Sequence, residues 1–244
     1  MITPQTDAHN LTPEDKVGPV YDNLAAYYGD LEWRPSTDPL SELILTILSQ
    51  HTSDLNRDRA FKAMRARFPT WEEVRDAPTD ELADSIRSGG LSNVKAPRIQ
   101  QVLRDISDER TELNLDFLME TPVEDAKKWL ARFKGVGPKT AACVLMFACG
   151  MPVLPVDTHV YRVSQRIGLI GPRTNADRAH TELEAIVEPD KRYSFHIYLI
   201  THGRQICKAP RPLCEKCVVS RWCNYYAETS GQRLLPPNAP GEAS

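Results

Sequence analysis

The segment Gly135–His159, GVGPKTAACVLMFACGMPVLPVDTH, is the part of the chain that best predicts its fold. Gly135 and Gly137 permit the positive φ angles of a tight turn, and Pro138 is well tolerated at the first position of a helix. A further helix is expected over residues 123–133, so the short turn predicts a helix-hairpin-helix. The unpaired amides at the start of the second helix, together with the positive end of its dipole, favour a bound anion such as a phosphate.

Lys139 lies in the first turn of that second helix, where the helix dipole disfavours a cation. Residues 127–139 contain five cationic side chains and no acidic one, which adds like-charge repulsion. Both features favour the neutral amine, the form that Schiff-base chemistry at an aldehyde-like carbon requires. A lysine after a glycine-rich turn also commonly serves only as a phosphate contact, and the turn by itself leaves both roles open.

The composition is that of an ordinary soluble globular protein. Of the 244 residues, 41% are apolar and 26% are charged. No apolar run approaches the roughly 18 residues that a membrane span requires, so no membrane partner is expected. The N-terminal residues are polar and lack the pattern of a secretory signal, and we therefore expect a cytoplasmic protein.

The charges are distributed unevenly along the chain. A net charge of −3 and a pI near 6.1 argue weakly against a nucleic-acid-binding protein. Residues 127–139 are nevertheless strongly cationic, and the segment 207–223 has Glu215 as its only acidic residue. Acidic residues concentrate at 13–15, 72–84 and 105–125. This separation of cationic from acidic segments is compatible with a single phosphate-binding face.

Turn and capping residues divide the chain into helical segments with few alternating runs, which predicts an all-α fold. Thr70 and Glu73 form a capping-box pattern, and Thr79 is a candidate N-cap for a helix that ends at Gly89-Gly90. The expected helices are 38–48, 59–68, one from 70, one from 79 to 89, 95–106, 123–133, the one after Gly137, 158–168, 176–187 and 193–206.

Four cysteines lie close together near the C-terminus. Cys207, Cys214, Cys217 and Cys223 are separated by six, two and five residues. Paired disulfides would be one interpretation, but a chain without a secretory signal is expected to stay reduced, which favours metal binding. Four thiolates suit tetrahedral zinc or a 4Fe–4S cluster, and their spacing does not decide between the two.

With these motifs the chain resembles the endonuclease III family of helix-hairpin-helix DNA glycosylases and AP lyases, over about residues 20–225. The hairpin GVGPKTA at 135–141, the segment VDTH at 156–159 and the four-cysteine loop each resemble a family motif, in the family's order and spacing. The resemblance implies a 4Fe–4S cluster rather than zinc. It also implies damaged double-stranded DNA as the partner, and we expect a monomer that associates with the nucleoid through DNA.

The resemblance further implies two helical domains with the DNA held between them. Residues 33–151 would form a six-helix barrel domain, with the helix-hairpin-helix at 125–149. Residues 1–32 and 152–244 would form the iron–sulfur cluster domain, with the cluster loop at 207–223. The tail 236–244 is expected to be disordered.

The family's functional positions are carried over residue by residue. Lys139 resembles the nucleophile that attacks C1′ of the damaged nucleotide, and Asp157 resembles the family's catalytic carboxylate. The alternative for Asp157 is an N-cap of the helix that begins at Thr158. Gln50 would fill the hole left by the extruded nucleotide and Leu91 would be the apolar wedge, although a solvated helix end and an ordinary turn residue are the alternatives. The residues implied to contact DNA are Gln50, Leu91, Gly135, Val136, Gly137 and Lys139.

The expected function is bifunctional removal of oxidised pyrimidines from duplex DNA. One alternative is a uracil or thymine mismatch glycosylase, but relatives of that type usually lack the hairpin lysine that Lys139 represents. The other alternative is a non-catalytic DNA-binding iron–sulfur protein. Ser92, where well-known relatives have tyrosine, and His51 depart from the family pattern and leave lesion recognition open.

Overall fold

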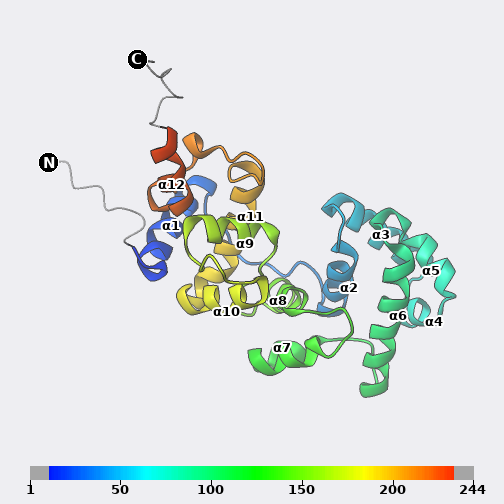
Figure 1. Ribbon diagram of the computed structural model, residues 1–244. Coiled ribbons are helices and arrows are strands. Elements are labelled where there is room, and N and C mark those ends of the chain that lie inside the picture. Colours follow the sequence, from blue (N-terminus) through cyan, green and yellow to red (C-terminus); the bar gives the residue numbers. More distant parts are fainter. Residues whose placement is uncertain (1–10, 234–244) are drawn as a thin grey trace, which may run out of the picture. The chain divides into compact units, whose positions relative to one another are not determined.

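The computed structural model describes residues 11–233 and consists of helices joined by turns (Figure 1). This described part contains α-helices and short 3-10 helices but no strand, which confirms the predicted all-α class. The tail 236–244, expected to be disordered, lies outside the described residues. Between residues 11 and 233, no helix is both long and apolar enough to cross a membrane.

The chain divides into two compact units. The first unit contains Met1–Glu32 and Val156–Ser244, and the second contains Trp33–Pro155. Segments from the two ends of the chain therefore fold together in the first unit, while the second is built from one continuous stretch. Lys139 belongs to the second unit, whereas Asp157 and the four-cysteine loop belong to the first.

The second unit is organised around α2, which packs against α3, α6 and α8. The apolar residues that recur at helical spacing on α2 are all fully buried. Burial of each such side chain contributes about 1.5–3 kcal/mol relative to exposure. These core residues are Leu40, Leu43, Ile44, Ile47 and Leu48. The elements of this unit are α2 Pro39–Ser49, α3 Asp54–Arg67, α4 Trp71–Asp76, α5 Thr79–Ser85, η2 Arg87–Gly89, α6 Ser92–Glu109, η3 Asp116–Glu120, α7 Val123–Ala131 and α8 Pro138–Phe147.

The capping box before α4 is confirmed, but the predicted cap of α5 is wrong. Glu73 N donates to Thr70 Oγ1 (3.1 Å), and Thr70 N donates to a Glu73 carboxylate oxygen (2.9 Å). Thr79 is instead the first residue of α5, with Pro78 at the N-cap and no side-chain cap. The Thr79 hydroxyl donates to Gln100 Oε1 on α6 (2.7 Å). The helix ends at Ser85 rather than continuing to the glycine pair.

The first unit brings α1 together with helices from the C-terminal part of the chain. α11 packs against both α9 and α1, and α12 packs against α9. Tyr198 of α11 is almost fully buried, and its hydroxyl donates to the carbonyl of Gly29 just after α1 (2.8 Å). The elements of this unit are α1 Pro13–Tyr28, α9 Thr158–Ile167, α10 Ala176–Ile186, η4 Pro189–Lys191, α11 Arg192–Gln205, η5 Cys214–Lys216, η6 Ser220–Trp222 and α12 Asn224–Arg233.

Candidate functional site

The turn between α7 and α8 exposes the backbone at the start of α8. Gly135 has a φ of +87°, as its place in a tight turn requires, and Gly137 is the N-cap residue of α8. Both glycines are exposed, whereas Val136 between them is buried and anchors the turn through Val136 N to Phe133 O (3.0 Å). Among the described residues, no side chain caps the first amides of α8. The turn can therefore present these amides to an anion.

Lys139 lies in the first turn of α8 and is half-buried. Its charge acts on Glu42 of α2. Burial raises the pKa of Glu42 above its ordinary value, and the hydrogen bond from Ser36 Oγ (2.7 Å) and the charges of Arg57 and Lys139 offset only part of this rise. The structure thus places a carboxyl group near the lysine amine within the same unit. Sequence reasoning missed Glu42, although a single acidic residue among the leucines and isoleucines of α2 was a visible signal.

Gln50 lies beside the hairpin turn rather than extending freely from the end of α2. Its Nε2 donates to the carbonyl of Gly135 (3.3 Å), and its Oε1 accepts from Arg98 Nη1 on α6 (2.8 Å). The structure therefore brings together two of the residues expected to contact DNA, Gln50 and Gly135. It also adds Arg98, which sequence reasoning did not single out. This network connects α2, α6 and the hairpin.

Gly135 is expected to tolerate substitution less well than Gly137. A Cβ on Gly135 would combine a positive φ with contacts of 2.6–2.8 Å to the Arg98 side chain, whereas a Cβ on Gly137 would meet nothing within 4 Å. Gly135→Ala should lower the free energy of unfolding by about 1–2 kcal/mol, mainly through backbone strain. Gly137→Ala is the matched control and should leave it unchanged or slightly raised. Chemical denaturation measures both, and equal effects would contradict the assigned strain.

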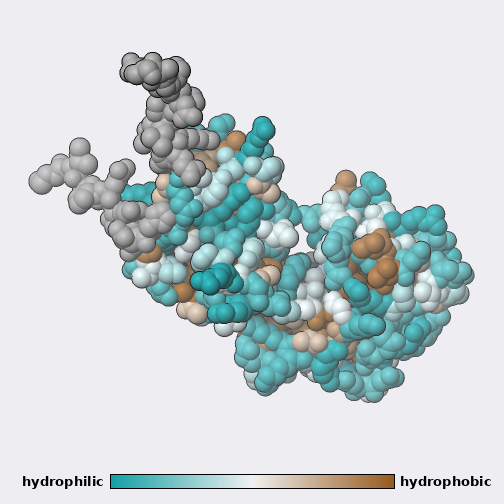
Figure 2. Space-filling view, viewed as in Figure 1, coloured by the Kyte–Doolittle hydropathy of each residue, from teal (hydrophilic) through white to brown (hydrophobic). Residues whose placement is uncertain are grey.

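Leu91, expected to be the wedge, is an exposed apolar residue at the start of α6. It is the N-cap residue, it has a φ of +50°, and its side chain is 55% exposed. Figure 2 shows that the visible face is mainly hydrophilic and carries separate hydrophobic patches. Val94 in the next turn is similarly exposed. An exposed apolar side chain held in a strained backbone is a common feature of functional sites.

Asp157 is the N-cap residue of α9, as the alternative interpretation predicted. Its Oδ1 accepts from the backbone amides of His159 (2.8 Å) and Val160 (2.7 Å). The side chain therefore satisfies two amides at the start of α9 that lack helical partners. Capping orients this side chain and does not exclude a chemical role.

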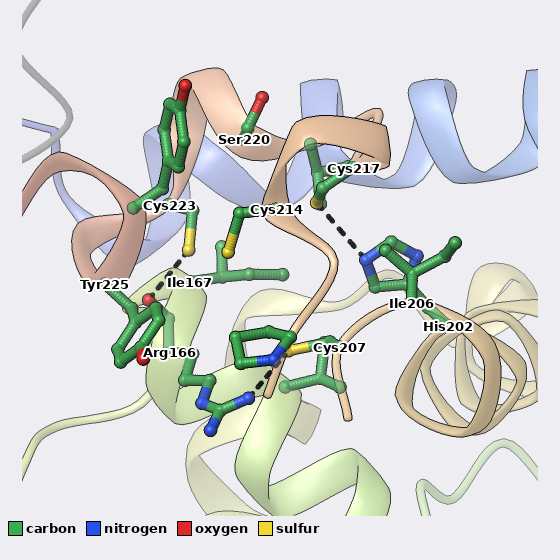
Figure 3. A pocket seen from close by; sticks show the side chains of 14 residues that line it. Arg166, Ile167, His202, Ile206, Cys207, Cys214, Cys217, Ser220, Cys223 and Tyr225 are labelled. Carbon is green, nitrogen blue, oxygen red and sulfur yellow. Dashed lines mark hydrogen bonds between the residues drawn. The ribbon is translucent and has the colours of Figure 1, made fainter. Parts of the chain in front are cut away.

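All four cysteines of the 207–223 loop line one pocket in the first unit (Figure 3). Cys217 Sγ lies 3.3 Å from His202 Nε2, and Arg166 Nη1 donates to Cys207 Sγ (3.4 Å). Burial raises the pKa of Cys217 to about 11 and that of Cys223 to about 12, and the neighbouring cysteines add to the rise. Within residues 11–233, no three His, Cys, Asp or Glu side chains are close enough together to bind one metal ion.

Comparison with known proteins identifies the class. Residues 44–189 match the model of the HhH-GPD superfamily base excision DNA repair proteins. Endonuclease III of Thermotoga maritima is 34% identical over 78% of this chain and 84% of its own length. A relative from Arabidopsis thaliana is 36% identical over 69% of this chain, and the chain spans 57% of that protein's length.

Solved structures agree with this match. The structure of a trapped endonuclease III–DNA covalent intermediate has a TM-score of 0.76 and 28% identity, and the match covers 90% of this chain and 99% of that one. A thermostable thymine-DNA glycosylase has a TM-score of 0.72 and 26% identity, with 91% of this chain and all of that chain covered. The chain therefore belongs to the HhH-GPD superfamily of base excision DNA repair proteins. Within that superfamily it is an endonuclease III-like enzyme, a DNA glycosylase of the class that also has AP lyase activity.

Proposed function

We propose that the enzyme removes oxidised pyrimidines from duplex DNA and then cleaves the strand, with Lys139 as the nucleophile. The observation that carries this proposal is the position of Lys139 in the first turn of α8, directly after the exposed glycine turn. A backbone phosphate bound at the turn would bring the sugar of an extruded nucleotide toward this amine. A similar solved structure is that of a trapped endonuclease III–DNA covalent intermediate, which supports a covalent step in the proposed reaction.

The proposed reaction breaks three bonds of the nucleotide in turn: the bond from C1′ to the base, the ring bond from C1′ to O4′, and the bond from C3′ to the 3′ phosphate. The neutral amine of Lys139 attacks C1′, the bond from C1′ to the base breaks, and the base leaves with the bonding electron pair and takes up a proton. The nitrogen then loses a proton, the ring bond from C1′ to O4′ breaks and O4′ takes up a proton, which leaves a protonated imine between Lys139 and C1′. Loss of a proton from C2′ then expels the 3′ phosphate by β-elimination. Asp157 would supply a carboxylate that stabilises positive charge on the sugar or accepts a proton.

The proposed DNA contacts lie on the hairpin and on two neighbouring turns of the second unit. The amides around Gly135, Val136 and Gly137 would bind the phosphate backbone, which positions the protein without reading sequence. Leu91 would enter the duplex, and this insertion would offset part of the few kcal/mol that extrusion of a nucleotide costs. Gln50, which holds the Gly135 carbonyl, would support the hairpin and face the space left by the nucleotide.

The four cysteines fit a 4Fe–4S cluster, which we propose as the resident group of the first unit. They line one pocket, and four cysteine thiolates are the donor set that a 4Fe–4S cluster takes. When bound, such a cluster can hold its loop in one conformation and exchange an electron. Cys207, Cys214, Cys217 and Cys223 would be its ligands.

Cys214→Ser is expected to remove the visible absorbance of the purified protein and most of its iron, because three thiolates no longer complete the cluster. The matched control is Cys149→Ser, which changes a half-buried cysteine of the other unit and should leave the spectrum and the iron content unchanged. Absorption spectroscopy with iron analysis measures both variants. A Cys214→Ser protein with full iron content would refute this ligand set.

A thymine mismatch glycosylase is the second candidate, because a thymine-DNA glycosylase structure also matches almost the whole chain. The presence of Lys139 supports the lyase-competent class over this candidate. Borohydride trapping on duplexes that contain thymine glycol, uracil or thymine opposite guanine, or an abasic site separates the two. An adduct on thymine glycol is the expected result. Base release from the thymine mismatch without an adduct would support the second candidate, and neither product on any duplex would overturn both.

A further inference from the structure

The first turn of α6 contains a buried lysine, Lys95. Its side chain is 1% exposed, and Nζ donates to two backbone carbonyls, those of Leu48 (2.7 Å) and Gly89 (2.7 Å). Burial lowers the pKa of Lys95, and the charge of Arg98 lowers it further. A buried ammonium is costly unless its surroundings compensate for it, so its presence here needs a reason.

The two carbonyls belong to two different turns of the second unit. Leu48 lies in the last turn of α2, where carbonyls lack helical partners and where the helix dipole favours a cation. Gly89 is the last residue of η2. A Cβ built on Gly89 would lie only 3.1 Å from the Ala60 side chain and 4.0 Å from the Leu48 oxygen, so these backbones are already close together. A single ammonium with several donors can bind both carbonyls at once.

Each of the two turns is followed closely by an exposed residue with a positive φ angle. Across residues 11–233, the non-glycine residues with positive φ are His51 (+55°) and Leu91 (+50°). His51 follows Leu48 by one short turn, and Leu91 follows Gly89 by two positions. Both side chains are exposed. Because the left-handed conformation is unfavourable for such residues, the surrounding structure must hold them in place.

We propose that Lys95 is a positioning residue for opening the duplex: by holding the carbonyls of Leu48 and Gly89 together, it presents His51 and Leu91 to the DNA as one rigid unit. This inference rests on the proposed function, in which Leu91 enters the duplex. Neither His51 nor Leu91 needs to touch Lys95, since the lysine acts through the backbone of the two turns. Loss of the ammonium should therefore weaken insertion more than it weakens binding to intact DNA.

The matched control for Lys95 is Gln100, which lies on the same helix. Gln100 is also 1% exposed, and its Nε2 donates to two backbone carbonyls, those of Val74 (3.3 Å) and Ala77 (2.7 Å). Val74 lies in α4 and Ala77 is the residue that directly follows this helix, so neither carbonyl belongs to the turns that lead to His51 and Leu91. Gln100→Met therefore removes a comparable pair of buried hydrogen bonds without changing those that hold the turns of His51 and Leu91.

The test measures binding of the full-length variants to a duplex with a stable abasic analogue and 2-aminopurine on the opposite strand, with the undamaged duplex as reference. Lys95→Met should lower affinity for the abasic duplex about tenfold, with little change in affinity for undamaged DNA. It should also reduce the rise in 2-aminopurine fluorescence that insertion into the abasic duplex causes. Gln100→Met should leave both readouts unchanged. Combining Lys95→Met with Leu91→Ala should cost no more than Leu91→Ala alone, because both changes remove the same insertion.

Three results would overturn the proposal: additive losses in the double variant, an equal loss in Gln100→Met, or unchanged insertion in Lys95→Met. If Lys95→Met does not fold, hydrogen exchange of the unaltered protein decides instead. Residues 50–54 and 90–94 should gain protection together on the abasic duplex, and protection of only one segment would contradict the shared unit. Failure of the proposed function is distinguishable, because the unaltered protein would then neither prefer the abasic duplex nor form a borohydride adduct.

Discussion

Lys139→Ala is expected to abolish the borohydride-trapped adduct and to slow base release by about a thousandfold or more, because no other amine takes the place of a removed nucleophile. Binding to a duplex with an abasic analogue should weaken only slightly, by the loss of one cation near the phosphates. The substitution leaves the hairpin backbone intact, since Val136 and not Lys139 anchors the turn. Trapping gels and single-turnover base release measure the two effects.

The matched control for this variant is Lys134→Ala. Lys134 is an exposed cation of the same segment, so its removal changes the net charge equally but leaves the amine of Lys139 in place. This control should form the adduct at the normal rate and show a similar small loss of affinity. An adduct that persists in Lys139→Ala would remove Lys139 as the nucleophile. Loss of the adduct in both variants would assign the effect to charge in the hairpin.

Asp157→Asn is expected to lower the rate of base release by about 10²–10³ while the free energy of unfolding changes little. Asparagine caps a helix as well as aspartate does, and its side-chain oxygen can accept from the amides of His159 and Val160. The substitution therefore keeps the cap and removes only the negative charge. Single-turnover kinetics and chemical denaturation on the same protein preparation separate the two roles.

Asp157→Ala completes this comparison. It removes both the charge and the cap, so it should lose as much activity as the asparagine variant and should in addition lower the free energy of unfolding by about 1 kcal/mol. Full activity in Asp157→Asn would show that the residue serves only as an N-cap. Activity that is lost in Asp157→Ala but kept in Asp157→Asn would likewise show that Asp157 serves only as an N-cap.

Local sequence signals predicted most helices because they act within a few residues. The capping box of Thr70 and Glu73 and the turn at Gly135 are both where the sequence placed them. Thr79 is not a cap because α5 begins at Thr79 itself, with Pro78 at the N-cap, and its hydroxyl instead donates to Gln100, a distant residue. The helix α1 was not predicted, although Thr12 and Asp15 form a capping box, since a glycine and Pro19 interrupt its pattern.

The parts of the candidate site that were not predicted are all contacts between distant positions. Gln50 binds the carbonyl of Gly135, and Lys95 binds that of Leu48, yet neither pair shares a motif in the sequence. Glu42 is near Lys139 only because α2 packs against α8. Such pairs depend on how helices pack, and helical periodicity reports which face of a helix is buried but not what it is buried against.

The amino-acid sequence by itself determined the all-α class, the glycine turn before α8, the position of Lys139 on it and the cysteine spacing, because each depends on backbone preferences or on chemistry within one short segment. Only the tertiary structure decided that the four sulfurs line one pocket, that Gln50 braces the hairpin, and that Lys95 joins two turns. These features require the burial of apolar helix faces to bring distant polar groups together, and buried polar groups then take whichever partners lie within reach.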